Sequence, residues 1–129
     1  MYLSECPVRA TINVIDGKWK PIIVNALKLR TLRFGELRRH VPEATTKVLT
    51  EQLRELEQDQ VIAREILGRR GERVEYRLTS YGRTLLPVLT LMAKWGKKHK
   101  RVVHSINVSR SQLRLTESRG RTLALKPRS

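Results

Sequence analysis

A group of residues suited to contacting phosphates and nucleic-acid base edges lies in the segment 45–54. Three hydroxyls and two cations fall close together there: Thr45, Thr46, Lys47, Thr50 and Arg54. If a helix begins at Thr45 or Thr46, the unpaired amides of its first turn add an anion-binding site. Acidic residues crowd the other end, residues 55–59, where they would repel phosphates. The segment therefore offers anion-binding chemistry at its N-terminal end, and the alternative is a merely solvated helix face.

A second basic cluster, "GRRGER" at residues 68–73, places Arg69, Arg70 and Arg73 around two glycines. Arginines on an exposed turn can reach the sugar-phosphate backbone or the minor groove of DNA, where the negative potential attracts them. The alternative is a solubilising turn. Further phosphate-contact candidates, each of which could equally be surface charge, are Lys18, Lys20, Arg38 and Arg39.

The charge balance of the chain indicates a polyanionic partner. The 129 residues carry 27 Lys+Arg and 12 Asp+Glu, a net charge of +15. Residues 97–129 hold ten basic residues and one acid, so this segment makes the total extreme. Nucleic acid is the expected partner, ahead of a membrane surface.

Length and composition indicate one domain with a modest core. No apolar run is long enough to span a membrane, and the N-terminus lacks a signal-peptide pattern. Cys6 is the only cysteine, which excludes an internal disulfide and favours a reducing, cytoplasmic setting.

The elements that position these side chains follow from periodicity. Helical spacing predicts helices over residues 7–16, 19–27, 34–41 and 46–59, and strand-like alternation predicts a hairpin around the turn at 68–71. In helix 46–59 the apolar stripe is Leu49, Leu53 and Leu56. The opposite face carries Lys47, Thr50, Glu51, Arg54 and Gln58. A last helix should begin at Thr79 or Ser80 and run to about Val103, with a kink at Pro87.

This order of elements predicts a mainly α fold with a small β-hairpin, a winged helix-turn-helix in which helix 46–59 faces the major groove. The expected division is a DNA-binding and dimerisation domain at 1–104 and a basic, flexible tail at 105–129, although a weak hairpin is conceivable in the tail. The last helix has a broad apolar surface. It could pack on the first helix, but we interpret it as half of a dimer interface.

Three stretches carry a resemblance to a known family: "CPVRATINVIDGKWKPIIVNAL", "LRFGELRRHVPEATTKVLTEQLRELEQDQVI" and "RVEYRLTSYGRTLLPVL". They closely resemble the HxlR-type winged helix-turn-helix transcriptional regulators of bacteria and archaea, over about residues 5–100. The resemblance implies a homodimer that binds an operator and is paired through its first and last helices. Residues of those helices that would form the interface are Val8, Ile12, Leu89, Met92 and Trp95.

The sequence departs from the family pattern at three places. The family usually has glycine at the position of Gln60, so a left-handed helix end must be formed by a residue with a Cβ. The arginine-rich turn at 68–73 is more basic than the family's usual proline-containing loop. The basic segment after residue 100 has no recognised counterpart.

Cys6 is a candidate sensor. Some members of the family that the chain resembles sense oxidants or electrophiles through a cysteine at this position. A thiol just before Pro7 lies at a helix N-terminus, which together with Arg9 favours the thiolate, whereas Glu5 opposes it. The alternative is a small buried side chain at the dimer seam.

No residues with the spacing of a catalytic or metal centre stand out, so the sequence predicts neither an enzyme nor a cofactor. His99 and His104 lack acidic or thiol partners nearby, and the "GRRG" turn joins strand to strand, unlike a phosphate-cradling loop. The expectation is a sequence-specific DNA-binding repressor acting as a homodimer on double-stranded DNA with a pseudo-palindromic operator. The alternatives are a basic architectural or RNA-binding protein with tail-dominated affinity, and a winged protein-interaction module.

Overall fold

The structure, a computed structural model, describes residues 6–128 of the chain, with side chains described as far as residue 117. The chain divides into two compact units, one up to Leu89 and one from Thr90 onward. Within the described residues, no helix combines the length and the apolar character needed to cross a membrane.

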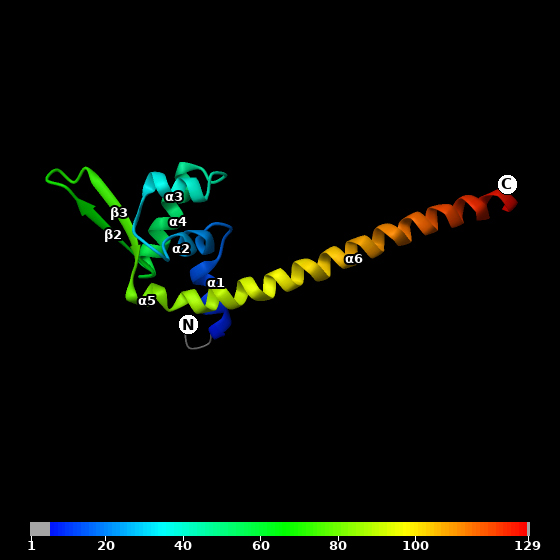
Figure 1. Ribbon diagram of the computed structural model, residues 1–129, viewed down its shortest axis with the longest axis horizontal. Coiled ribbons are helices and arrows are strands. Elements are labelled where there is room, and N and C mark those ends of the chain that lie inside the picture. Colours follow the sequence, from blue (N-terminus) through cyan, green and yellow to red (C-terminus); the bar gives the residue numbers. More distant parts are fainter. Residues whose placement is uncertain (1–5, 129) are drawn as a thin grey trace. The chain divides into compact units, whose positions relative to one another are not determined.

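The first unit is mainly helical with a small sheet, as predicted (Figure 1). In chain order its elements are α1 (Pro7–Ile15), α2 (Lys20–Ala26), β1 (Leu32–Arg33), α3 (Phe34–His40), α4 (Thr46–Gln58), β2 (Ile62–Leu67), β3 (Arg73–Leu78) and α5 (Ser80–Arg83), followed by the start of α6 (Leu85–Arg128). The four predicted helices and the hairpin are therefore confirmed.

The sheet is antiparallel with strand order β1-β3-β2. β2 and β3 form the predicted hairpin, in register from Ile62 opposite Leu78 to Leu67 opposite Arg73. The base of the hairpin is fixed to the core because Ile62, Tyr76 and Leu78 are buried, and its other end extends away from the helices (Figure 1). The strand β1 was not predicted, since two residues are too few to show an alternating pattern.

The core of this unit holds α4 against α2 and α3. The predicted stripe of α4, formed by Leu49, Leu53 and Leu56, is at most 2% exposed, and Val48 lies at its edge. Ile23 of α2 and Leu37 of α3 are fully buried in the same cluster. Since each such side chain stabilises the fold by about 1.5–3 kcal/mol on burial, this stripe decides which face of α4 remains outside.

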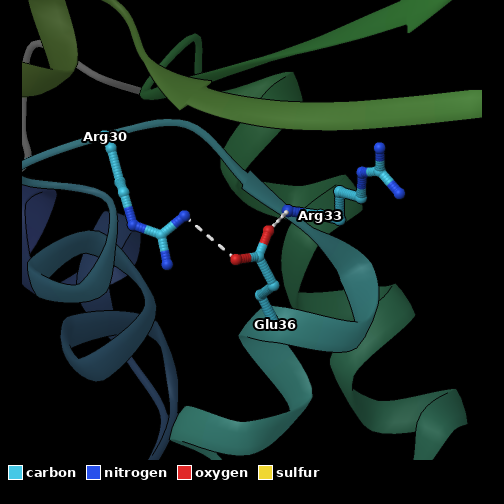
Figure 2. Close-up of polar contacts among 3 residues, drawn as sticks. All are labelled: Arg30, Arg33 and Glu36. Atoms are coloured by element: carbon cyan, nitrogen blue, oxygen red, sulfur yellow. Dashed lines mark hydrogen bonds and ion pairs between the residues drawn. The ribbon is translucent and has the colours of Figure 1, made fainter.

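The start of α3 is fixed by Glu36, whose two carboxylate oxygens have different partners (Figure 2). Oε1 accepts a hydrogen bond from the Arg33 backbone amide at 3.0 Å, and Oε2 pairs with Nη1 of Arg30 at 2.9 Å. The amide hydrogen bond and the Arg30 guanidinium lower the pKa of Glu36 below its ordinary value. The carboxylate thus joins the loop before α3 to the first turn of the helix.

The end of α4 turns sharply through a left-handed residue. Gln60 has φ of +63°, which confirms the prediction that a residue with a Cβ forms the left-handed helix end. The amide of Val61 bonds to the Leu56 carbonyl at 3.0 Å, and that of Gln60 bonds to the Glu57 carbonyl at 3.0 Å, the paired bonds of a Schellman motif. This motif directs the chain from α4 straight into β2.

The last helical region is interrupted where the proline predicts it. Thr79 caps α5 by accepting a hydrogen bond from the Gly82 amide at 2.8 Å. Because Pro87 has no amide to bond to the Arg83 carbonyl, α5 ends at Arg83 and Pro87 falls in the first turn of α6.

The predicted helix end near Val103 is wrong, because α6 runs to Arg128 and residues 105–128 form neither a hairpin nor an irregular segment. No glycine or proline occurs between Gly96 and Gly120 to interrupt the helix. The alternation of Leu113 and Leu115 had suggested a strand. The division of the chain at residue 104 and the flexibility of the tail remain predictions.

Candidate nucleic-acid interface

The outer face of α4 is the face that the sequence predicted. Lys47, Thr50, Glu51, Arg54 and Gln58 are all exposed, and the two preceding threonines are exposed as well. The buried leucine stripe fixes this orientation, so the face is presented by a helix that cannot rotate without exposing its stripe.

The hydroxyls at the start of α4 are oriented by local hydrogen bonds. Thr45 is the N-cap, and its Oγ1 accepts from the Val48 amide at 3.1 Å, which leaves its own hydrogen available to a phosphate oxygen. Thr50 donates to the Thr46 carbonyl at 2.7 Å, so its oxygen can still accept. Helix geometry leaves the amides of Thr46 and Lys47 without an intrahelical partner. The N-terminal end of α4 therefore combines oriented donors, acceptors and one lysine.

Arg38 connects the two helices of the helix-turn-helix. Its Nη1 donates to Oγ1 of Thr46 at 2.9 Å, so this guanidinium positions the first residue of α4. Arg38 is half-buried, whereas the neighbouring Arg39 is exposed. Of the two predicted phosphate contacts on α3, Arg39 is the more accessible, and Arg38 has a positioning contact within the protein.

The structure corrects the sequence prediction for Lys20. It was expected to be a surface phosphate contact, but its side chain is 5% exposed and forms an ion pair with Glu55 of α4. The cause is the position of Lys20 at the start of α2, which packs against α4. Lys18 remains accessible at 71% side-chain exposure, with Glu43 at 3.7 Å and its ammonium 4.9 Å from the Trp19 ring centre.

The acidic end of α4 is partly neutralised by the protein itself. Glu55 pairs with Lys20, and Glu57 lies 3.8 Å from the guanidinium of Arg64 in β2. Glu51 and Asp59 are exposed. In the folded protein, Lys47 thus points outward at the start of α4, and two of the acids near its end are paired with cations of the protein itself.

The hairpin turn presents its arginines without acidic partners. Arg69, Arg70 and Arg73 are exposed, and within the described residues none of them forms an ion pair. Glu72 instead accepts a hydrogen bond from the Arg70 backbone amide at 3.0 Å. Gly68 and Gly71 have φ of +90° and +65°, a conformation that favours glycine and lets the turn close. The three guanidinium groups therefore form a cationic tip with one acid, Glu72, which is bound to the backbone of the turn.

Arg64 is a residue that the sequence reasoning did not single out. It lines a shallow hollow together with Arg54, Glu57 and Gln58, where β2 passes the end of α4. The signal was present in the alternation of β2, because Arg64 has the same parity as buried Ile62 and so lies on the face turned toward α4. Arg54 and Arg64 together extend the cationic surface from the helix toward the hairpin.

The residues proposed for a dimer interface are mostly uncovered in the single chain. Val8 is 65% exposed, Met92 48% and Trp95 66%, and Ile12 is also exposed. Leu89 is half-buried because it packs partly against the core of its own chain.

Cys6 is exposed and precedes the first turn of α1, where its carbonyl accepts from the Ala10 amide at 3.0 Å. In the part of the chain that the structure describes, no three His, Cys, Asp or Glu residues gather as a metal site would require. His99 stacks on Trp95 instead, with ring centres 5.0 Å apart.

Two helices joined by a short turn, followed by a hairpin with a cationic tip, define a winged helix-turn-helix protein. The family model described as HxlR-like helix-turn-helix matches residues 14–104, and the chain belongs to this family. It is therefore a DNA-binding transcriptional regulator of the helix-turn-helix type. Helix α6 continues beyond the matched residues to Arg128.

Named relatives support this assignment. The uncharacterized HTH-type transcriptional regulator YdeP of Bacillus subtilis (strain 168) is 45% identical over 105 residues, covering 81% of this chain and 82% of the relative. The redox regulator HypR in its reduced form is similar with a TM-score of 0.73 and 43% identity, covering 78% of this chain and 99% of that one. HypR in its oxidized form gives a TM-score of 0.67 and 45% identity, covering 72% and 96%.

Proposed function

We propose that this protein is a homodimeric repressor that binds a pseudo-palindromic operator through the outer face of residues 45–54, at and after the start of α4, and through the cationic hairpin tip. The observation that carries the proposal is the polarity of α4. Its first two turns present oriented hydroxyls, free amides and Lys47, while Glu55 and Glu57 near its end pair with the protein's own cations. A duplex would approach the start of the helix, because phosphates are attracted to the donors and Lys47 there, whereas the exposed Asp59 at the other end would repel them.

The roles follow from the chemistry of each group. Lys47 and Arg54 can contact base edges or phosphates, and Thr50 has an oxygen free to accept from a base amino group. Thr45 can donate to a phosphate. Arg69, Arg70 and Arg73 at the hairpin tip would reach the backbone or the minor groove, and Lys18 and Arg39 would add phosphate contacts.

The exposed apolar residues of α1 and α6 support a dimer. Large apolar side chains left uncovered on two helices favour a second copy as the covering partner, since two-fold pairs are the commonest assemblies and groove-reading modules commonly work as pairs. Sedimentation equilibrium should give twice the monomer mass, and the double variant Met92→Glu/Trp95→Glu should be monomeric. A wild-type protein that remains monomeric at micromolar concentration would contradict the dimer.

The experiment that tests the function is selection of binding sites from random duplex DNA at physiological salt with excess competitor. A regulator of this kind should enrich a two-fold symmetric sequence with half-sites about one helical turn apart. Enrichment of no sequence would favour an architectural protein. The net charge of residues 97–129, ten basic residues against one acid, is the observation behind that second candidate. Deletion of residues 105–129 should leave the selected sequence unchanged if the first proposal holds.

Regulation through Cys6 forms a further part of the proposal. Its support is the exposure of the thiol before α1 and the likeness to a redox regulator known in reduced and oxidized forms. Two Cys6 thiols, one from each protomer, would transfer two electrons and two protons to diamide and form one disulfide between the subunits. Changing Cys6→Ser should abolish the response of DNA binding to diamide and the diamide-induced dimer band on a non-reducing gel. An unchanged response of DNA binding would remove the sensor role.

A further inference from the structure

The second unit carries a concentrated cationic face that the proposed reading of DNA by α4 does not use. Five cations fall within eight residues of α6, and all are exposed: Lys94, Lys97, Lys98, Lys100 and Arg101. None of the five forms an ion pair within the part of the chain that the structure describes. The sequence contains no Asp or Glu between Glu75 and Glu117. We call these five residues the basic face.

Helical spacing makes the basic face a continuous surface. Lys94 and Lys98, and likewise Lys97 and Arg101, are four residues apart and therefore neighbours on the helix. Like charges at this spacing destabilise a helix, and no acid on the same helix lies close enough to relieve them. A row of external anions would remove this repulsion.

The opposite side of the same segment is mainly apolar, with the His99 ring stacked on Trp95 inside it. It is formed by exposed residues of α6: Leu91, Met92, Trp95, Val102, Val103 and Ile106. At 3.6 residues per turn, the centre of this apolar arc lies about 160° from the centre of the basic face. An apolar arc covered by a second copy or by any other surface would therefore leave the basic face pointing outward.

We propose that the basic face of α6 binds the phosphate backbone of duplex nucleic acid independently of sequence, as a second contact surface in addition to α4 and the hairpin tip. From Lys94 to Arg101 the helix rises about 10 Å, which corresponds to about three phosphates along one strand of a duplex. Lysines dominate the face, and lysine suits phosphate as a point charge without requiring the geometry of a base edge.

The geometry favours nucleic acid over an anionic membrane. In a helix lying on a membrane, the apolar side enters the lipid, and flanking lysines extend sideways to the headgroups. Here the centre of the basic face points almost directly away from the apolar arc. A helix whose apolar arc lay in lipid would therefore direct most of these charges into solvent.

The test compares two variants of the full chain that each remove five of the 15 net charges. Glutamine replaces each cation, because it keeps helix propensity. The test variant changes the basic face, namely Lys94→Gln, Lys97→Gln, Lys98→Gln, Lys100→Gln and Arg101→Gln. The matched control changes cations elsewhere: Arg9→Gln, Lys28→Gln, Arg110→Gln, Arg114→Gln and Arg119→Gln. Circular dichroism should show the wild-type helix content in both variants.

Binding to a mixed-sequence 20-base-pair duplex is measured by anisotropy between 50 and 200 mM salt. Loss of about three phosphate contacts should reduce the magnitude of the slope of log K against log salt by about 2.7 per protomer. Over this fourfold range, wild-type binding should therefore weaken roughly 40-fold more than binding of the basic-face variant. The control variant should keep the wild-type slope.

Three outcomes would overturn the proposal: an unchanged slope in the basic-face variant, equal slope changes in both variants, or loss of binding to phosphatidylserine vesicles with an unchanged duplex slope. The last result would assign the basic face to membranes. Because the duplex has no operator, the result does not depend on sequence reading by α4. Failure of the proposed operator binding would appear instead in the selection experiment.

Discussion

The ion pair between Lys20 and Glu55 should respond asymmetrically to substitution. The side chain of Lys20 is 5% exposed, whereas that of Glu55 is 50% exposed. Replacing Glu55 with methionine leaves a buried ammonium without its carboxylate. Replacing Lys20 with methionine leaves a carboxylate that water can reach, and the methionine fills the space of the lysine stem. The loss of stability should therefore be larger for Glu55→Met, although Glu55 is the more exposed partner.

The magnitudes follow from burial. Removing one partner of a fully buried pair costs about 3–5 kcal/mol because the remaining charge is uncompensated, and partial access of water to this site lowers that to about 2–4 kcal/mol for Glu55→Met. For Lys20→Met we expect about 1 kcal/mol or less, since the remaining carboxylate is hydrated and screened. Against a typical total of about 5–15 kcal/mol, the first loss is large and the second is small.

Urea denaturation followed by circular dichroism measures both values, at one protein concentration because dimer stability depends on it. Glu51→Met is the matched control, since Glu51 lies on the exposed face of the same helix. It should change stability by no more than about 0.5 kcal/mol. Equal losses in the two ion-pair variants, or a larger loss for Lys20→Met, would show that burial of the Lys20 ammonium does not determine the cost of breaking the pair.

Three further predictions concern backbone geometry and pH. Gln60→Gly should raise the free energy of unfolding by about 0.5–1 kcal/mol, because φ of +63° strains a residue with a Cβ. A lower urea midpoint than that of wild type would contradict this. Gly82→Ala should lose about 1–3 kcal/mol, since its Cβ would collide with the Val61 carbonyl oxygen, whereas Gly35→Ala has open space and should be tolerated. Similar urea midpoints for Gly82→Ala and Gly35→Ala would contradict the close approach of Gly82 to the Val61 carbonyl. Because the pKa of Glu36 is lowered in the folded protein, its ionised carboxylate stabilises the fold at pH values above the ordinary pKa of 4.5. This stabilisation is lost as the pH falls below that value. The free energy of unfolding of Glu36→Gln, measured by urea denaturation between pH 6 and pH 3, should therefore fall less than that of wild type. An equally steep fall would show that ionisation of Glu36 does not contribute to stability.

Local patterns in the sequence predict most of the first unit. The 3.6-residue spacing of Leu49, Leu53 and Leu56 sets both the buried and the exposed face of α4, and alternation sets the hairpin. These features are predictable because each depends on neighbours within one element. The arginine-rich turn was likewise recognisable from its glycines.

Other features depend on contacts between distant residues and could not be predicted locally. Lys20 resembled a surface cation until the fold brought Glu55 beside it, 35 positions along the chain. The strand β1 exists only because Leu32 and Arg33 pair with β3. The alternation of Leu113 and Leu115 favours a strand, whereas the absence of glycine and proline between Gly96 and Gly120 allows α6 to continue beyond Val103.

In the proposed function, residues 45–54 read the base sequence and the hairpin tip supplies affinity. The most direct measurement compares the sites selected from random duplex DNA by wild type, by Lys47→Ala/Thr50→Ala/Arg54→Ala, and by the tip variant Arg69→Gln/Arg70→Gln/Arg73→Gln. All six side chains are exposed, so both variants should fold. We expect the helix variant to show relaxed base preference at symmetric positions of both half-sites. The tip variant should select the wild-type sequence at lower affinity. An unchanged selected sequence from the helix variant would contradict the proposed function.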